Sequence, residues 1–194
     1  LTRRHGGSHG RSTGVQGGGM KRDDLIFDGY RPGALAQMLS LHMNYYGSQW
    51  NLGRQFEIYC AEGMAAFFAN FDANLDYFLA AWNENGKMIG SIVIDGHKAK
   101  KEGAQLRWFI VDASSHGLGI GRYLLDQAME FCRNRDFDNI FLMTFAGLHA
   151  SRRLYESAGF QLVDEKKDDP WSGERGELVF RHNKGDGKPT QKPA

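Results

Sequence analysis

The sequence is poor in cysteine and has no long apolar run, and both absences narrow the class of protein. Only two cysteines occur in 194 residues, and both fall in apolar patterns of helical period. We therefore expect Cys60 and Cys132 to be buried thiols in a reducing compartment rather than a disulfide. No apolar stretch approaches the roughly 20 residues that a membrane-spanning helix needs, and no signal-peptide core is found. These features predict a soluble, cytoplasmic protein that does not act at a membrane.

The sequence also lacks an excess of charge of either sign. Lys and Arg number 24 against 23 Asp and Glu, which gives a net charge of +1. Nucleic-acid-binding proteins concentrate Lys and Arg on one face, so we expect no nucleic-acid partner. His5 and His9 could bind a metal, but they are isolated in a glycine-rich tail, and we expect no metal site.

The two ends of the chain offer little that a core could bury. Residues 1–19 are mostly Gly, Ser, Arg and His, and Met20 stands where folded-looking sequence begins. This segment is interpreted as a disordered tag or upstream read-through. Residues 183–194 are rich in Gly, Pro and Lys and are predicted to be a disordered tail. One domain is expected between them, at 20–182.

Within this domain, hydrophobic periodicity alternates between the helical and the strand repeat. Asn85-Gly86 supplies the positive-φ pair of a tight hairpin turn, so the strands around it should pair antiparallel. The near-continuous apolar end of the strand at 105–112 indicates burial on both faces. Strand–helix–strand order in the second half predicts parallel pairing there, hence a mixed sheet in an α/β (α+β) fold. The predicted strands are 25–30, 75–82, 88–94, 105–112, 139–144, 160–164 and 177–181. The predicted helices are 34–46, 54–69, a third helix that follows the strand at 105–112, and 150–158. The third helix is expected to face inward with Ile120, Leu124, Ala128, Phe131 and Cys132.

A glycine-rich loop opens the third of these helices, in the segment His116-Gly117-Leu118-Gly119-Ile120-Gly121-Arg122. Glycines at every second position free the backbone to curl, so that successive N–H groups can point into one concavity. Unsatisfied N–H groups and the helix dipole favour an anion at such a helix N-terminus. The loop therefore predicts a phosphate-bearing ligand, against the alternative of a turn that only packs a helix onto a sheet.

The spacing of the glycines argues against two common phosphate-binding motifs. The dinucleotide fingerprint G-x-G-x-x-G fails in both registers, because Arg122 or Leu124 stands where its third glycine would be. The P-loop fails as well, because no Gly-Lys-Ser/Thr follows the glycines. A pyrophosphate held by backbone N–H groups alone fits coenzyme A better than a nucleotide that needs lysine and magnesium.

The segment 106–160 resembles the core of GNAT-type N-acetyltransferases. Gly119 and Gly121 match the small positions of the family's acetyl-CoA motif, Gln/Arg-x-x-Gly-x-Gly/Ala, and His116 replaces its first residue. The run Leu154-Tyr155-Glu156-Ser157-Ala158-Gly159-Phe160 is similar to the Leu-Tyr-Glu-x-x-Gly-Phe ending of a family helix. The wider pattern, with Leu106-Arg107-Trp108-Phe109 and Thr144-Phe145-Ala146-Gly147-Leu148, most resembles acetyltransferase domains fused to MarR-type regulators, although no winged-helix segment is expected before this one.

The resemblance implies the GNAT fold, a mixed central sheet of about seven strands flanked by about four helices. It also implies an acyl-CoA-dependent N-acyltransferase, in which a primary amine attacks the thioester of acetyl-CoA directly. The strand before the glycine loop would carry a bulge and splay from its neighbour, and the pantetheine arm would pair with the freed backbone groups. One backbone N–H there could polarise the thioester oxygen. The residues implied to bind coenzyme A are Phe109, Ile110, Val111, His116, Gly117, Leu118, Gly119, Ile120, Gly121, Arg122, Thr144, Ala150, Ser151 and Tyr155.

Tyr155 is predicted, from its place in the helix motif, to be the general acid. The departing thiolate of coenzyme A, whose thiol pKa is about 8.5, leaves more easily if a donor stabilises or protonates its sulfur. Ser151 and Tyr155 lie four residues apart and therefore share one helix face. The alternative is that Tyr155 is a half-buried packing residue whose hydroxyl is satisfied.

The acceptor amine is expected between the first two helices, the exposed side of the central strand and the C-terminal loop. Aromatic side chains in these segments indicate an apolar or cation–π component in its recognition. Glu57, Glu62, Asp112 and a chain of waters are the candidates for the base that takes the proton of this amine. His149 precedes the helix at 150–158 and is expected to lie near its N-cap. The candidate lining residues are His42, Tyr45, Tyr46, Trp50, Arg107, Trp108 and Trp171. His42 lies on the apolar face of its helix, so the alternative for this residue is a place in the core or at its rim.

A second function stays open, that of a non-catalytic acyl-CoA sensor or interaction domain. Such a domain would keep the glycine loop without needing Tyr155, so the presence of this tyrosine favours an enzyme. A homodimer formed through the C-terminal strands is compatible with the sequence, and the amine could be a small metabolite, an antibiotic, a peptide N-terminus or a lysine side chain.

Overall fold

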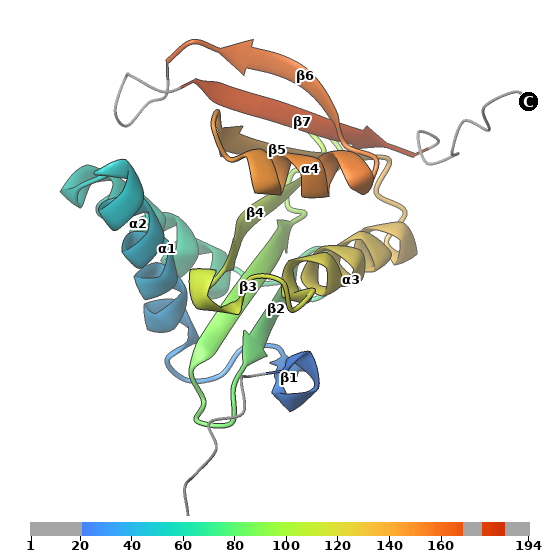
Figure 1. The fold of residues 1–194 in the computed structure, drawn as a ribbon. Helices are drawn as coiled ribbons and strands as arrows, with labels where there is room; N and C mark the ends of the chain where they lie inside the picture. Colours follow the sequence, from blue (N-terminus) through green and yellow to red (C-terminus); the bar gives the residue numbers. More distant parts are fainter. Residues whose placement is uncertain (1–20, 169–175, 185–194) are drawn as a thin grey trace, which may run out of the picture.

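The computed structural model describes residues 21–168 and 176–184, so the predicted N-terminal segment, Trp171 and most of the predicted tail lie outside the described residues. Within these ranges the chain forms seven strands and four α-helices (Figure 1). The strands are β1 (Ile26–Asp28), β2 (Tyr77–Trp82), β3 (Met88–Asp95), β4 (Ala104–Val111), β5 (Asn139–Phe145), β6 (Gln161–Lys166) and β7 (Glu177–Asn183), and the helices are α1 (Ala34–Trp50), α2 (Arg54–Ala69), α3 (Ile120–Asn134) and α4 (His149–Ser157).

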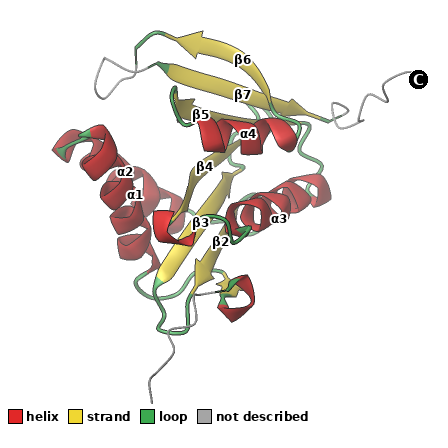
Figure 2. Ribbon diagram, viewed as in Figure 1, coloured by secondary structure: helices red, strands yellow, loops and turns green. Residues whose placement is uncertain are grey.

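The strands form one mixed sheet in the order β1-β2-β3-β4-β5-β7-β6. Neighbouring strands pair antiparallel except β4 and β5, which α3 connects and which pair parallel. This agrees with the predicted mixed sheet, because a crossover helix is the usual connection between parallel neighbours. Helices α1 and α2 lie on one side of the sheet, and α3 and α4 lie on the other (Figures 1 and 2).

Each face of the sheet carries its own hydrophobic core. One core joins α1 and α2 to side chains such as Phe78 and Val93, and the other joins α3 and α4 to side chains such as Ile92 and Phe180. β3 is buried along nearly all of its length because both cores cover it. The predicted free thiols lie one in each core, and burial raises the pKa of both Cys60 and Cys132 to about 12. No helix of the described chain combines the length and the apolarity needed to cross a membrane.

A β-bulge interrupts the pairing of β3 with β4. Between the pairs Ser91–Ile110 and Val93–Arg107, β4 has two residues where β3 has one. Trp108, in the bulge, has a positive φ of 44°, and its carbonyl accepts a hydrogen bond of 3.2 Å from the hydroxyl of Ser91. Such a bulge bends the strand and increases its twist. It also lies where the family resemblance implied one.

β4 separates from β5 just before this bulge. Their parallel pairing covers Ala104 to Leu106 on β4 and Ile140 to Leu142 on β5, and no further pairs follow although both strands continue. The sequence predicted that the apolar end of β4 is buried on both faces, and this is wrong for Phe109 and Val111, which are only partly buried. The reason is that the separation exposes this end of the strand to a cleft instead of a neighbouring strand.

Several element ends also differ from the prediction by a few residues, and two of these differences lengthen an element that packs in the core or pairs in the sheet. α1 runs to Trp50 rather than residue 46, because the aromatic side chains of its last turn pack on Phe56 and Phe145 and continue the core. β7 extends to Asn183, which pairs with Asn139, so the first residue of the predicted disordered tail belongs to the sheet.

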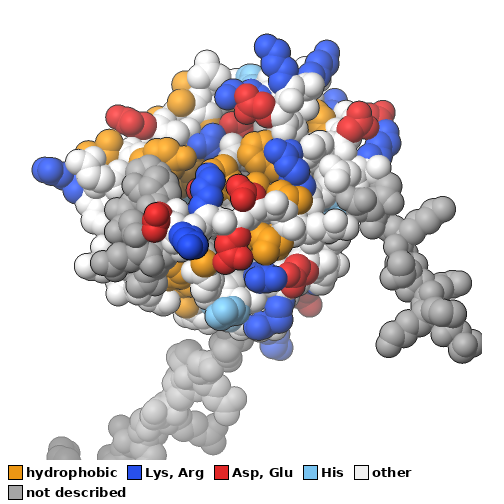
Figure 3. All heavy atoms as spheres, turned by 90° about the horizontal axis from the view of Figure 1, so that it is seen from above, with side chains coloured by type: hydrophobic (Ala, Val, Ile, Leu, Met, Phe, Trp, Pro, Cys, Tyr) orange, Lys and Arg blue, Asp and Glu red, His pale blue; other side chains and the backbone are white. Residues whose placement is uncertain are grey.

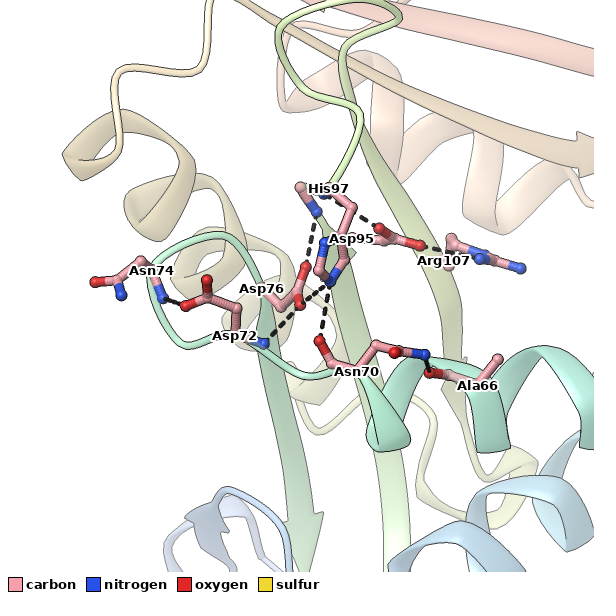
Figure 4. A network of polar contacts seen from close by, with 9 residues as sticks. Ala66, Asn70, Asp72, Asn74, Asp76, Asp95, His97 and Arg107 are labelled. Atoms are coloured by element: carbon pink, nitrogen blue, oxygen red, sulfur yellow. Dashed lines mark hydrogen bonds and ion pairs between the residues drawn. The ribbon is translucent and has the colours of Figure 1, made fainter.

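A buried carboxylate ties the α2–β2 loop to the end of β3 (Figure 4). The side chain of Asp76 has no exposed surface and accepts backbone N–H groups of Asp72 and Gly96, each at 3.0 Å. Its Oδ2 lies 3.0 Å from Nε2 of His97, which also lies 3.1 Å from the carbonyl of Asn70. This carboxylate therefore satisfies polar groups from two loops that lie far apart in the sequence.

We expect Asp76→Ala to lower the free energy of unfolding by about 3 kcal/mol, because it removes two hydrogen bonds to the Asp76 side chain and leaves one buried and one partly buried N–H group unsatisfied. Urea denaturation followed by circular dichroism measures this change. Asp138→Ala is the control, since its side chain is 84% exposed and its loss should change stability by less than about 0.5 kcal/mol. Equal stability of the two variants would contradict a structural role for Asp76.

The surface seen from above, over the end that carries β6 and β7, shows basic and acidic side chains interspersed rather than segregated (Figure 3). Some charged side chains of the described chain form ion pairs, such as Arg152 with Glu156 and Lys184 with Asp136. β6 is an edge strand with a bulge and a run of charged residues, features that discourage pairing with another sheet. The predicted homodimer through the C-terminal strands stays a prediction.

Candidate active site

Two glycines of the predicted glycine loop adopt backbone conformations that favour glycine. After β4, Asp112 caps a short 3₁₀ turn by accepting the backbone N–H of Ser114 at 3.0 Å and its hydroxyl at 2.7 Å. Gly117 and Gly119 follow with φ of 84° and 72°, values that residues with a side chain rarely adopt. A Cβ built on either glycine meets no atom within 4 Å. The loop therefore surrounds open space at the N-terminus of α3, where N–H groups attract an anion.

A cleft of about 790 Å³ extends from this loop along the separated end of β4. It brings together most of the residues predicted to bind coenzyme A. The predicted residues that line it are Phe109, Ile110, Val111, His116, Gly117, Gly119, Ile120, Gly121, Ala150 and Ser151, joined by Tyr45 and Tyr46 of α1. No ligand-binding role was predicted for the further lining residues Ser115, Gly147, Leu148, Arg153 and Leu154, and His149 was predicted only to lie near a helix N-cap.

Four predicted coenzyme-binding residues do not line this cleft. Leu118 packs against the core, and the guanidinium of Arg122 donates to the hydroxyl of Ser157 on α4. Thr144 and Tyr155 line a second, adjoining cavity instead. The sequence does not show which of these positions line the cleft and which do not, because the course of the cleft depends on where β4 and β5 separate.

Ser115 is a site residue that no sequence pattern indicated. It is 1% exposed, lies in the wall of the cleft beside the glycine loop, and its hydroxyl has no hydrogen-bond partner within the described residues. Buried hydroxyls are nearly always partnered, so the missing partner is unusual. The Oγ atom itself has almost no exposed surface, so a ligand atom would reach it only after a small movement of the cleft wall.

The second cavity, of about 400 Å³, lies between α1, α2 and the separated strands. It shares Tyr46 and Phe109 with the first cleft, so the two spaces meet at these side chains. Residues from both faces of the sheet meet here, because the gap between β4 and β5 passes through the sheet. Of the predicted acceptor residues, His42, Tyr46, Arg107 and Trp108 line this cavity, and further lining residues include Phe56, Tyr59, Cys60, Phe145 and Glu177.

Two predicted acceptor residues lie elsewhere. Tyr45 lines the first cleft only, and Trp50 is a core residue whose ring packs on Phe145 at 5.2 Å. The predicted base candidates are not brought into the second cavity: Glu57 and Glu62 are exposed on α2, and Asp112 pairs with Lys87 at 3.3 Å.

Tyr155 reaches the second cavity from α4. The residue is 5% exposed, and its ring packs among Phe109, Phe160 and Phe180 with centroids about 6 Å away. Its hydroxyl has no hydrogen-bond partner within the described part of the chain and is not fully enclosed. Burial raises the pKa of the Tyr155 phenol, so the hydroxyl stays protonated and acts as a donor. The ring therefore packs in the core, as the alternative expected, while the hydroxyl faces the second cavity and lacks a partner among the described residues.

Both charged side chains of the second cavity have partners. Nη1 of Arg107 lies 3.1 Å from Oδ2 of Asp95, and its guanidinium lies 4.0 Å from the centroid of the Trp108 ring. The carboxylate of Glu177 lies 2.6 Å from Nζ of Lys166. Aromatic side chains make up much of the remaining wall, so an amine entering the cavity would lose much of its hydration.

The fold and the two joined cavities define a domain that can hold a long, phosphate-bearing ligand with its far end at the centre of a split sheet. The chain belongs to the acetyltransferase (GNAT) family, whose model matches residues 35–160. This family uses acetyl-CoA as co-substrate. The glycine loop and the separated strands fit that molecule, since they offer N–H groups for a pyrophosphate and unpaired backbone groups for an extended arm.

Comparison with individual proteins agrees with the family. A stretch of 78 residues is 33% identical to N-acetylaspartate synthetase of Xenopus tropicalis, and it covers 40% of this chain and 28% of that protein. The match therefore spans little more than a quarter of the length of that relative.

Solved structures share the whole architecture. A GNAT-family acetyltransferase from Staphylococcus aureus Mu50 superposes with a TM-score of 0.67 at 17% identity, over 82% of this chain and 98% of that chain. The ribosomal-protein-S18-alanine N-acetyltransferase from Escherichia coli superposes with a TM-score of 0.61 at 17% identity, over 82% and 93% of the two chains. These identities show the fold alone, and they confirm the predicted GNAT fold.

Proposed function

We propose that this chain is an N-acetyltransferase that moves an acetyl group from acetyl-CoA to a primary amine by direct attack on the thioester. The observation that carries the proposal is the junction of the two cavities. A coenzyme cleft that begins at the glycine loop ends at Phe109 and Tyr46, where a separate aromatic cavity opens from the other side. Both substrates can therefore be bound at once with their reacting atoms at the junction.

The first cleft would hold acetyl-CoA by its backbone. N–H groups between Gly117 and Gly121 would bind the pyrophosphate. The hydroxyl of Ser115, which the cleft wall covers, would donate to the same ligand after a small movement of that wall. The unpaired backbone of β4 from Phe109 to Val111 would pair with the pantetheine arm as a strand pairs with its neighbour. A backbone N–H in this stretch would then polarise the thioester oxygen.

The reaction itself would need little from side chains. The neutral amine forms the C–N bond as the C–S bond breaks, and the proton lost by nitrogen ends on the thiol of coenzyme A. Tyr155 would donate a hydrogen bond to the sulfur as negative charge develops on it. Because burial raises the pKa of its phenol above the usual value, full proton transfer to a thiolate is uphill, and donation of the hydrogen bond is the main contribution.

Two of the compared proteins carry names that indicate amine substrates, an aspartate in one and an alanine of a ribosomal protein in the other. They support a primary amine here without choosing between a small metabolite and a peptide. The proposed enzyme is soluble and cytoplasmic, as its composition predicts, and its likeness to domains fused to MarR-type regulators stays a prediction.

Calorimetric titration of the protein with acetyl-CoA, with NADH and ATP as controls, tests the proposal. We expect micromolar binding of acetyl-CoA alone, followed by release of thiol when a panel of primary amines is added. Binding without transfer to any amine would favour the acyl-CoA sensor instead. A folded sample that binds neither acetyl-CoA nor longer acyl-CoAs would contradict both functions.

Ser115→Ala separates ligand binding from stability. We expect acetyl-CoA affinity to fall about fivefold, because the variant loses one hydrogen bond to the ligand, worth about 1 kcal/mol. The unfolding free energy should not fall, since the hydroxyl has no partner in the described chain. Titration calorimetry and thermal denaturation measure the two quantities on the same sample. Loss of stability with unchanged affinity would show that the hydroxyl serves the fold.

A further inference from the structure

His42 offers an unused hydrogen-bond acceptor to the second cavity. The residue lies in the middle of α1, is 4% exposed, and has its Nδ1 atom 2.8 Å from the carbonyl of Met38. A carbonyl only accepts hydrogen bonds, so Nδ1 must carry the proton. Burial lowers the pKa of the imidazole to about 4, so the ring is neutral at physiological pH. Nε2 is therefore the unprotonated nitrogen of a fixed tautomer.

Nothing in the described chain occupies this second nitrogen. His42 has no hydrogen bond other than that to Met38, and its ring stacks at 6.2 Å on the ring of Tyr46. Nε2 is not fully enclosed, although the residue is almost completely buried, because the residue forms part of the cavity wall. A buried acceptor without a partner is costly, so its presence in a cavity indicates a ligand that donates to it.

The other polar groups of this cavity differ from a neutral imidazole nitrogen that only accepts. Gln105 and Thr144 also line it, and their side chains can donate as well as accept. Arg107 only donates, and its ion pair with Asp95 occupies it. The carboxylate of Glu177 is paired with Lys166. Burial raises the pKa values of the nearby Tyr46 and Tyr155, so both phenols stay protonated and keep a donor beside their acceptor oxygen, unlike Nε2 of His42, which only accepts.

We propose that Nε2 of His42 accepts a hydrogen bond from the acceptor amine and so turns the nitrogen lone pair toward the thioester. This inference rests on the proposed acetyl transfer and names the residue that orients its primary amine. A primary amine has two N–H groups: one is held by His42 and remains as the amide N–H, while the other gives up the proton that ends on coenzyme A. A secondary amine has only one N–H, which cannot serve both purposes. The site therefore selects primary over N-methylated amines.

Two substitutions of His42 separate its two nitrogens. His42→Asn can keep a donor near the place of Nδ1 for the carbonyl of Met38 but has no acceptor near the place of Nε2. His42→Gln puts an amide oxygen near the place of Nε2 and gives up the local bond to Met38. We expect His42→Asn to lower kcat/KM for the primary amine that the thiol-release screen identifies by about tenfold. The Kd of acetyl-CoA should stay within twofold, and His42→Gln should recover at least a third of the wild-type kcat/KM.

Turnover by His42→Asn equal to that of the wild type, or an equal loss in both variants, would overturn the proposal. The unmodified enzyme provides a second test that does not depend on folding of a variant: kcat/KM for the N-methyl derivative of the same amine should be at least tenfold lower. Equal turnover of the two amines would also overturn it. A wild-type enzyme that binds acetyl-CoA but acetylates no amine would instead contradict the proposed function, which keeps the two failures distinct.

Discussion

Replacing Tyr155 with Phe should lower kcat by at least tenfold, and by about a hundredfold if the hydroxyl supplies most of the stabilisation of the leaving sulfur. The substitution keeps the ring, which packs among Phe109, Phe160 and Phe180, so the core around it should remain intact. Acetyl-CoA affinity should be nearly unchanged, because the hydroxyl lies in the second cavity and acts on charge that develops only in the transition state. Steady-state kinetics with calorimetric Kd values on the same preparation measure both quantities.

Tyr77→Phe is the matched control for this experiment. Tyr77 is also a partly buried tyrosine whose pKa burial raises, but it lies on β2 with its ring stacked on Phe131 at 5.0 Å. Its hydroxyl does not line either cavity. Unchanged turnover in Tyr155→Phe, or an equal loss in Tyr77→Phe, would remove Tyr155 from the mechanism and leave it as a packing residue.

Gly119→Val should weaken acetyl-CoA binding by at least fiftyfold, which corresponds to about 2.3 kcal/mol. A β-branched residue at φ 72° is strongly disfavoured, so the loop would shift and its N–H groups would no longer converge. The new side chain would also project into space that the loop now leaves open for the ligand. Titration calorimetry measures the affinity, and thermal denaturation shows whether the fold survives.

A second glycine in the chain gives this test its control. Gly86 has the same φ of 72°, and a Cβ built there likewise meets no atom within 4 Å, but it lies in the β2–β3 hairpin turn, away from both cavities. Gly86→Val therefore carries a comparable backbone strain without touching the coenzyme cleft. If both variants lost acetyl-CoA affinity to the same extent, the effect would be one of stability and not of the loop.

Most of the fold could be predicted from the sequence because its local signals agree with the final structure. The helical period of α3, the Asn85-Gly86 turn and the glycines before Ile120 each specify an element without reference to the rest of the chain. Hydrophobic periodicity could not place the end of parallel pairing at Leu106, and only the family resemblance implied that this strand leaves its neighbour. An apolar run looks the same whether its far end meets a strand or a cleft, and Phe109 and Val111 were therefore assigned to a fully buried strand.

The candidate site was likewise predictable only in part. The glycine loop was predictable because its chemistry lies in consecutive residues, whereas Ser115 and the free nitrogen of His42 depend on contacts formed between distant segments. A histidine on the apolar face of a helix carries the same sequence pattern whether both of its nitrogens are satisfied or only one. The hydrogen bond to Met38 and the adjoining cavity distinguish these cases, and neither can be read from spacing.

The early end of the β4–β5 ladder also bears on how the protein avoids aggregation. Unpaired strand edges usually lie at the rim of a sheet, where they invite the strands of other molecules. Here an unpaired edge lies inside the sheet, with Tyr46 of α1 on one side and Leu154 of α4 on the other. Because this edge faces β5 and the helices rather than the rim of the sheet, a strand of another molecule cannot extend the sheet there as it could at an outer edge. The position of the gap therefore lets the protein keep an open edge without becoming a template for self-association.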